Sequence, residues 1–469
     1  MQAVRLRRGE IILFEEYLKT IDEQAESITK LSDFLWDHPE TAFQEKESSK
    51  AIADYLENAG FQIVREAAEI PTAFMATYGT GKPHLGILAE YDALPGLSQE
   101  ANCTAPRAID GRENGHGCGH NLFAGGSVAA ALAVKSYIEK TGKGCVTLFG
   151  CPAEEGGGGK VFMARAGLFR DIDAVVSWHP ESMYMVRTRP ALANVKVRYR
   201  FQGIAAHAGA NPEAGRSALD AVELMNVGAN FLREHMDLTS RIHYAILDAG
   251  GKAPNVVQSH AEVAYLIRAI DSEAVRELRE RVDKIAQGAA LMTETEVRST
   301  ITGGYANLIT IPTLQATANE AMHDIPLPVP TEAEMQFARA LQQTMKMTEV
   351  QKAAPLYAEK VLDPAPPKAH GGSTDTADVS WNCPTVQMHV GTWVTGTPGH
   401  SWQSVTQGKG SYAHKAMLWA GKAVAGTILR LMENPEMLAK AREEWQEKTQ
   451  GRYSCALSPD MKPTSPELL

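Results

Sequence analysis

Potential metal ligands and general bases occur at only a few points of this sequence, and several of them follow a short apolar segment directly. In open parallel sheets, functional groups collect at the carboxyl ends of the strands. Carboxylates, a thiol and imidazoles from four such points could therefore converge on one site. The residues concerned are Glu90, Asp92, Cys118, His120, Glu154, Glu155 and His179.

Cys118 and His120 are separated by one glycine and stand just before an alanine-rich segment with a helical pattern. In an extended or turn conformation, this spacing can direct both side chains at one ion. A thiolate is also favoured at a helix N-terminus, where the dipole and the free N–H groups attract negative charge. The alternative is a buried structural cysteine, since cysteine is among the most buried residue types.

Glu154 and Glu155 are adjacent acids followed by four glycines, residues 156–159. Burial would raise the pKa of one carboxyl group unless a cation compensates for the repulsion. With a metal present, one carboxylate could be a ligand and the other a general base. The glycines would allow a tight turn and leave room for a substrate. A solvated acidic turn is the alternative.

Two histidines outside the Cys118 motif are further candidate ligands. His179 lies between Trp178 and Pro180, and His400 lies in the Pro-Gly-His-Ser-Trp segment that ends at Trp402. Taken singly, each is equally compatible with a hydrogen-bonded structural histidine, so their assignment depends on the other motifs.

The elements that must position these residues are of two kinds. The segments 84–89, 146–150 and 174–178 are short and apolar throughout, with helical patterns between them. Such strands, alternating with helices, are typical of a parallel sheet buried on both faces. The segment 195–201 instead alternates apolar and charged residues, which indicates an antiparallel strand with one solvated face.

After that strand, the patterns predict the order β-α-β-β-α-β as far as residue 300, a ferredoxin-like unit. We therefore expect an α/β fold, in which a catalytic domain with a mostly parallel sheet, covered by helices on both faces, is interrupted by an inserted α+β lid. The predicted ranges are 1–192 and 307–469 for the catalytic domain and 193–306 for the lid. One continuous α/β domain with long loops is less favoured, because loops of that size are rare. The tail after Trp445 is expected to be a surface extension.

Composition excludes several classes of protein. The chain has 469 residues, and 46 Lys and Arg against 56 Asp and Glu give a net charge of −10. The absence of a dense basic run argues against nucleic acid or an anionic membrane as partner. No apolar stretch approaches the ~20 residues that span a bilayer, and the first residues lack a secretion signal. Six scattered cysteines fit a reducing compartment, so the cytoplasm is the expected location.

Five motifs, taken together and in this order, resemble the dinuclear metalloamidohydrolases, the metallopeptidase family of aminoacylase, hippurate hydrolase and indoleacetyl-amino-acid hydrolase. The similarity runs along nearly the whole chain. The motifs are Glu90-Tyr-Asp-Ala-Leu-Pro95, Cys118-Gly-His-Asn121, Ala153-Glu-Glu-Gly156, Trp178-His-Pro-Glu181 and Gly396-Thr-Pro-Gly-His400.

This resemblance implies a ligand set for two divalent cations, zinc or manganese, with cobalt as a further candidate. Cys118 would bridge the two ions. His120 and His179 would complete one site, and Glu155 and His400 would complete the other.

The resemblance also implies roles for residues around the metals. Glu154 would be the general base, and Asp92 would orient a metal ligand. In the inserted lid, His207 would stabilise the oxyanion in the site of a partner subunit, and Asn255 would contact the substrate.

The implied reaction is hydrolysis of the amide bond of an N-acyl amino acid, with p-aminobenzoyl-glutamate as the expected substrate. A dipeptidase or general aminoacylase acting on another amino acid is an alternative, as is a non-catalytic partner subunit of a homologous hydrolase. The lid would form a homodimer or a heteromer with such a subunit. For an acyl-glutamate, Arg216 and Arg268 are candidates for binding the carboxylates, although each could equally be a surface charge.

Two positions depart from the family pattern. Many members of the amidohydrolase branch have aspartate where Asn121 stands, and they often have aspartate where Glu90 stands. The first change is expected to remove a charge near the metals, and both weaken the assignment of the substrate more than that of the chemistry.

Overall fold

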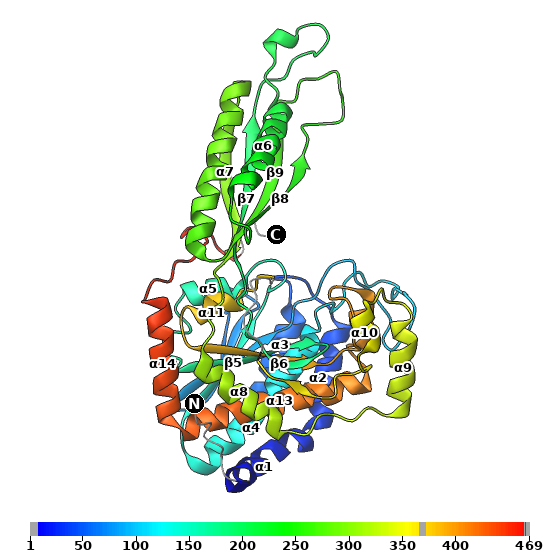
Figure 1. Cartoon of the computed structure of the whole chain (residues 1–469), viewed down its shortest axis with the longest axis vertical. Helices are drawn as coiled ribbons and strands as arrows, with labels where there is room; N and C mark the ends of the chain where they lie inside the picture. Colours follow the sequence, from blue (N-terminus) through cyan, green and yellow to red (C-terminus); the bar gives the residue numbers. More distant parts are fainter. Residues whose placement is uncertain (1–7, 365–371, 464, 466–469) are drawn as a thin grey trace. The chain divides into compact units, whose positions relative to one another are not determined.

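The computed structural model describes residues 8–364, 372–463 and 465 (Figure 1). The chain forms two compact units. We call residues 1–188, 309–366 and 379–452 the large unit, and residues 189–308, 367–378 and 453–469 the small unit.

The large unit contains an eight-stranded mixed sheet in the order β1-β2-β4-β3-β5-β12-β6-β11. Its central strands β4, β3, β5 and β12 are mutually parallel, as the apolar segments predict, whereas β1, β2 and β6 run antiparallel to their neighbours β2, β4 and β12. The strands are β1 (Gln62–Arg65), β2 (Phe74–Gly79), β3 (His84–Glu90), β4 (Cys145–Cys151), β5 (Ala174–Glu181), β6 (Tyr184–Val186), β11 (Val361–Leu362) and β12 (Thr385–Gly391).

Helices pack against this sheet and against one another. The longest two, α4 and α13, contact each other and both contact β5, while α8 contacts β6 and β12. The helices of the large unit are α1 (Arg8–Glu23), α2 (Ala25–Asp37), α3 (Lys46–Asn58), α4 (His120–Thr141), α5 (Gly159–Arg165), α8 (Pro312–Asp324), α9 (Glu332–Gln342), α10 (Glu349–Ala353), α12 (Trp402–Gln407), α13 (Ser411–Glu433) and α14 (Pro435–Thr449), with Thr376–Ser380 (α11) at the boundary.

The small unit has the predicted order β-α-β-β-α-β. Its four antiparallel strands are arranged β10-β7-β9-β8, and α6 and α7 cover one face of the sheet (Figure 1). In β7, alternate residues such as Val197 and Tyr199 are buried beneath the helices, which is the physical reason for the alternating pattern. The elements are β7 (Ala193–Gln202), α6 (Ala218–Leu232), β8 (Arg241–Asp248), β9 (His260–Ala269), α7 (Ser272–Thr293) and β10 (Glu296–Tyr305).

The C-terminal tail differs from its prediction. Residues 453–469 belong to the small unit rather than extending from the catalytic domain, and Leu457 and Met461 are buried. The hydroxyl of Tyr453 donates a hydrogen bond to Asp378, whose other oxygen accepts from the backbone of Ala306. The tail thus has apolar and polar partners of its own, which its Pro-rich, polar composition did not indicate.

Candidate metal centre

The candidate ligands lie at the carboxyl ends of the parallel strands. Strand β3 pairs with β4 on one side and with β5 on the other, so the ends of these strands are neighbours. Glu90 is the last residue of β3, His179 lies near the end of β5, and His120 begins α4. The loop after β4 adds Glu154 and Glu155. Segments that are distant in sequence therefore meet at one edge of the sheet.

One group of potential ligands consists of Cys118, His120 and His179, whose ligand atoms all lie within 4.8 Å of one another. The sulfur of Cys118 is 3.4 Å from Nε2 of His179. Nδ1 of His179 lies 2.8 Å from the carbonyl oxygen of Pro180, so it carries the proton and donates to that oxygen. Burial, followed by the charge of His120, lowers the pKa of His179 to about 3. His179 is therefore a neutral imidazole with a lone pair directed at Cys118.

A second group shares the same cysteine and consists of Cys118, Glu155 and His400. Nε2 of His400 is 3.2 Å from Oε1 of Glu155. The hydrogen bond to Glu155 raises the pKa of His400. The His400 side chain is 53% exposed, whereas that of Glu155 is 10% exposed, so this group is open to solvent on the histidine side.

Asp92 connects the two groups. The Nδ1–H group of His120 donates to one carboxylate oxygen of Asp92, at 2.9 Å, and the backbone N–H of Glu155 donates to the other, also at 2.9 Å. This arrangement fixes the tautomer of His120 and turns its Nε2 atom toward Cys118 and the other potential ligands. Nε2 of His120 and Oε1 of Glu155 are both buried and make no hydrogen bond, so each is a ligand atom to which the protein supplies no hydrogen-bonding partner.

Glu154 lies beside this centre, in a third group with Glu90 and His120. Burial, followed by the charge of Glu90, raises the pKa of Glu154 to about 7. Glu90 is itself held by the buried amine of Lys160, 2.7 Å away, and its other oxygen is 3.2 Å from Nε2 of His120. Sequence reasoning assigned no role to Glu90 and did not consider Lys160. The position of Glu90 at a strand end was the available signal, whereas nothing marked Lys160.

The glycine-rich loop has a close-packed backbone where Glu154 begins. Ala153 has a φ of 60°, and its N–H donates to the buried carboxylate of Glu45. A β-carbon on Gly157 would lie 2.1 Å from the ring of Phe43, and one on Gly159 would lie 2.1 Å from the carbonyl oxygen of Pro152. At least these two glycines are therefore required by close contacts, in addition to any space they leave for a substrate.

The donors fit a pair of divalent cations. Burial raises the pKa of the Cys118 thiol, so a thiolate at this position requires a nearby positive charge. The mixture of thiolate, imidazole and carboxylate ligands suits zinc and neighbouring transition metals. Cys118 is common to both groups, so one sulfur could contact two ions.

Asn121 does not have the place that the sequence suggested for it. Its amide nitrogen donates to the side chain and carbonyl of Ser32 and to the carbonyl of Gly408. The residue therefore anchors the start of α4 to α2 and to the end of α12. The expectation that asparagine here removes a charge near the metals is wrong, because these contacts direct the side chain into the protein core.

Two predicted site residues lie together in exposed loops of the small unit. The backbone N–H of Ala208 donates to the carbonyl of Asn255, and His207 forms a bridge with Val256. The N–H groups of Gly209 and Ala210 donate to Nδ1 of His207, each at 3.1 Å. These contacts leave the proton of a neutral His207 on Nε2, which is a hydrogen-bond donor available to a ligand.

The two predicted carboxylate-binding arginines are engaged within the small unit. Nε of Arg216 is 2.7 Å from a carboxylate oxygen of Glu294, and its NH1 donates to the carbonyls of Glu213 and Gly215. Arg268 donates to the hydroxyl of Ser373 at 2.6 Å. These partners favour a structural role for both, and their binding of substrate stays a prediction.

The comparison with known families agrees with this centre. The model of peptidase family M20/M25/M40 matches residues 86–404, which include all five potential ligands. The chain belongs to this family. It is accordingly a metal-dependent amidohydrolase, as the motifs predicted.

Relatives of this M20 family member include two that are named for an activity. It is 42% identical to one of the subunits of the p-aminobenzoyl-glutamate hydrolase of Escherichia coli (strain K12), over 96% of this chain and 99% of the relative. It is 30% identical to the Xaa-Arg dipeptidase of Homo sapiens, over 92% and 91% of the two chains. The solved structure of a dinuclear metal-binding M20 peptidase from Bacillus subtilis is 18% identical, with a TM-score of 0.54 over 86% of this chain and 98% of that one, which supports the fold.

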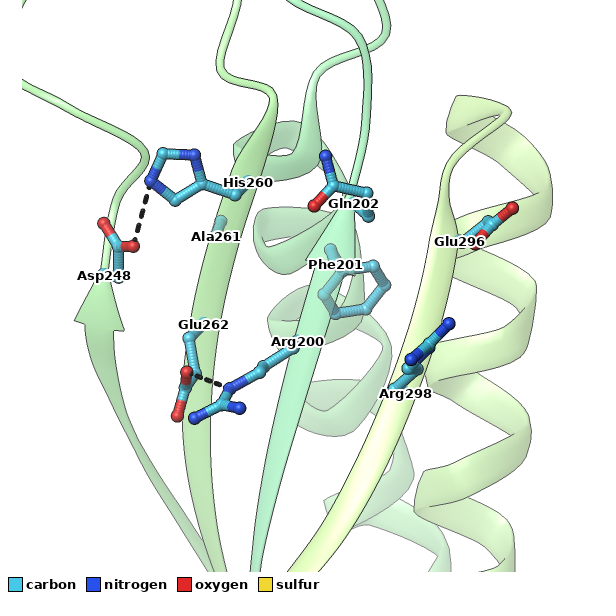
Figure 2. A pocket seen from close by; sticks show the side chains of 9 residues that line it. All are labelled: Arg200, Phe201, Gln202, Asp248, His260, Ala261, Glu262, Glu296 and Arg298. Carbon is cyan, nitrogen blue, oxygen red and sulfur yellow. Dashed lines mark hydrogen bonds and ion pairs between the residues drawn. The ribbon is translucent and has the colours of Figure 1, made fainter. Parts of the chain in front are cut away.

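A separate hollow lies on the strands of the small unit (Figure 2). Its charges largely compensate one another, since Arg200 pairs with Glu262 at 2.5 Å and His260 with Asp248 at 3.2 Å. Because these acids and bases pair with each other, we assign it no chemistry. The lining residues are Arg200, Phe201, Gln202, Asp248, His260, Ala261, Glu262, Glu296 and Arg298. Among the described residues, no helix is both long and apolar enough to cross a membrane.

Proposed function

We propose that this M20 family member hydrolyses the amide bond of an N-acyl amino acid and that p-aminobenzoyl-glutamate is its substrate. The observation that carries the proposal is the sharing of Cys118 by two groups of potential ligands, with Glu154 beside them. The named activity of the Escherichia coli relative, which is similar over almost the full length of both chains, supports the choice of substrate.

In the proposed centre, His120 and His179 hold one cation, Glu155 and His400 hold the other, and Cys118 contacts both. Zinc, manganese or cobalt would suit this mixture of ligands. When bound, the cations would lower the pKa of a water molecule and polarise the carbonyl group of the substrate.

Glu154 is the proposed general base. Its carboxylate accepts a proton from the attacking water and later delivers it to the nitrogen of the leaving amine. A pKa raised to about 7 by burial and by the charge of Glu90 suits both steps, because the group can bind and release a proton near neutral pH.

His207 is the proposed donor to the oxyanion. Replacing it with alanine is expected to lower kcat about 100- to 1,000-fold, as loss of one oxyanion-hole donor does elsewhere, because Nε2 carries the proton that would be donated. Steady-state kinetics would measure this loss, and His243→Ala, at an exposed histidine of β8 in the same unit, is the control. A change in KM alone would contradict the assignment.

We further propose that the small unit mediates assembly with a second copy or a homologous subunit and that His207 acts in the partner's site. In a mixture of inactive His207→Ala and Glu154→Gln chains, mixed dimers would contain one intact site. Activity should then recover to about a quarter of the wild-type value for random pairing of two-fold dimers. No recovery, with mixed dimers demonstrated by mass spectrometry, would show that His207 acts within its own chain or not at all.

Asp92 is proposed to orient His120. The variant Asp92→Asn is expected to bind its metals about 10- to 100-fold more weakly, because an amide holds the imidazole less firmly than a carboxylate does. Competition with a chelator would measure the affinity. Asp33→Asn is a matched control, since Asp33 makes a 2.9 Å contact with His414 outside the metal centre. Equal affinities in the two variants would refute the role of Asp92.

A dipeptidase is the second candidate, because the human relative is named for that activity. The purified chain, loaded with zinc, manganese or cobalt, would be assayed with p-aminobenzoyl-glutamate, N-acetyl-methionine and a dipeptide ending in arginine, with metal content measured on the same samples. We expect fastest release of p-aminobenzoate. Fastest cleavage of the dipeptide would favour the second candidate. Metal-loaded protein that cleaves none of them would indicate a non-catalytic partner subunit.

A further inference from the structure

Arg187 has a place in the large unit that its sequence context did not suggest. It follows β6 directly, and its backbone N–H donates to the carbonyl of Gln387 on β12 at 2.9 Å. Its guanidinium NH1 also donates to the side-chain oxygen of Gln387, at 2.6 Å. Two contacts to one residue fix the arginine against the sheet.

The strand register places Arg187 on the face of the sheet that carries a metal ligand. Met185 pairs with His389 across β6 and β12, and His389 pairs with His179 across β12 and β5. Paired residues project from the same face, and so do alternate residues of one strand. The rings of His179 and His389 have centroids 6.5 Å apart. Arg187, two residues beyond Met185, therefore projects from the face of His179.

The guanidinium lacks a direct counter-ion in the described part of the chain. It is half-buried, and its one side-chain hydrogen bond goes to the neutral amide of Gln387, which is itself 4% exposed. Burial lowers the pKa of Arg187, while the charges of Glu154, Glu181 and Glu90 oppose that effect, so the group lies within electrostatic reach of the general base. A partly desolvated cation whose only hydrogen-bonding partner is neutral is costly unless an anion completes its environment.

We propose that Arg187 binds a carboxylate of the substrate and makes the site selective for acidic over neutral and basic N-acyl amino acids. The inference rests on the proposed function and specifies its substrate class. With NH1 held by Gln387, the other nitrogens of the planar fork can contact a carboxylate. The arginine would also repel a substrate that ends in arginine or lysine, which distinguishes this chain from an Xaa-Arg dipeptidase.

The test compares three N-benzoyl amino acids, the glutamate, glutamine and lysine derivatives, in the wild type and in Arg187→Met. We expect kcat/KM for the glutamate derivative to fall about 10- to 100-fold, the range of a lost hydrogen bond to a charged group. The value for glutamine should stay within about threefold, and that for lysine should rise. Arg170→Met, at an exposed arginine of the large unit, is the control and should behave as the wild type. Arg187→Lys should retain part of the preference.

Equal losses on all three substrates, or no loss on any, would overturn the proposal. If Arg187→Met proves unfolded by circular dichroism, the comparison of Arg187→Lys with the wild type decides in the same way. If the wild type cleaves none of the compounds, the proposed function fails, and calorimetric binding of N-benzoyl-glutamate then tests Arg187 separately. Weaker binding by Arg187→Met than by Arg170→Met supports a carboxylate site, and equal binding refutes it.

Discussion

Glu154→Gln is expected to lower kcat about 100- to 10,000-fold, the range attributed to general acid–base catalysis, while leaving the metal content unchanged. Glutamine has nearly the same size as glutamate but cannot accept a proton from water. Glu154 is outside the two groups that share Cys118, so neither proposed cation loses a ligand. Stopped or steady-state assays combined with elemental analysis of the same sample would measure both quantities.

The control for this variant is Glu447→Gln, at an exposed glutamate of α14. Two outcomes would contradict the assignment of Glu154. Retained turnover would show that another group takes the proton. A parallel loss of metal and activity would show that Glu154 is a ligand, which the geometry also permits, because Glu154, Glu90 and His120 form a group of their own.

Cys118→Ser is expected to have the second large effect, the loss of most bound metal and with it nearly all activity. The sulfur is common to both groups of ligands, and Cys118 lies 3.4 Å from Nε2 of His179. A serine hydroxyl is a poor substitute, because it is much less acidic than a thiol and is a harder ligand. Elemental analysis after dialysis would show the loss.

Cys103→Ser is the matched control, since Cys103 is also a half-buried free cysteine of the large unit. Its metal content and activity should equal those of the wild type. If Cys118→Ser kept both metals, the bridging role would be refuted. If it kept only one, the sulfur would belong to a single site, and restoration experiments with zinc and manganese would identify which histidines hold the remaining ion.

Several elements were predictable because their residues have one dominant environment. Strands β3, β4 and β5 are buried on both faces, so they are apolar throughout and stand out in the sequence. The alternation in β7 follows equally directly from one face covered by helices. In contrast, β12 contains Gln387 and His389 among apolar residues, and β6 has only three residues. Neither has a periodicity that indicates a strand, and both form because neighbouring strands supply hydrogen bonds.

The sequence by itself determined the chemistry: a cysteine, histidines and carboxylates in ordered motifs, which specified a family, a reaction class and the proposed ligands. Their spacing carries this information because each motif lies in a short local turn or strand end. Only the tertiary structure decided what surrounds them. Asp92 contacts both ligand groups, Lys160 neutralises Glu90, Asn121 faces the core, and Arg187 reaches the face of His179. These relations depend on strand register and on burial between segments far apart in the chain, and no local pattern encodes either of them.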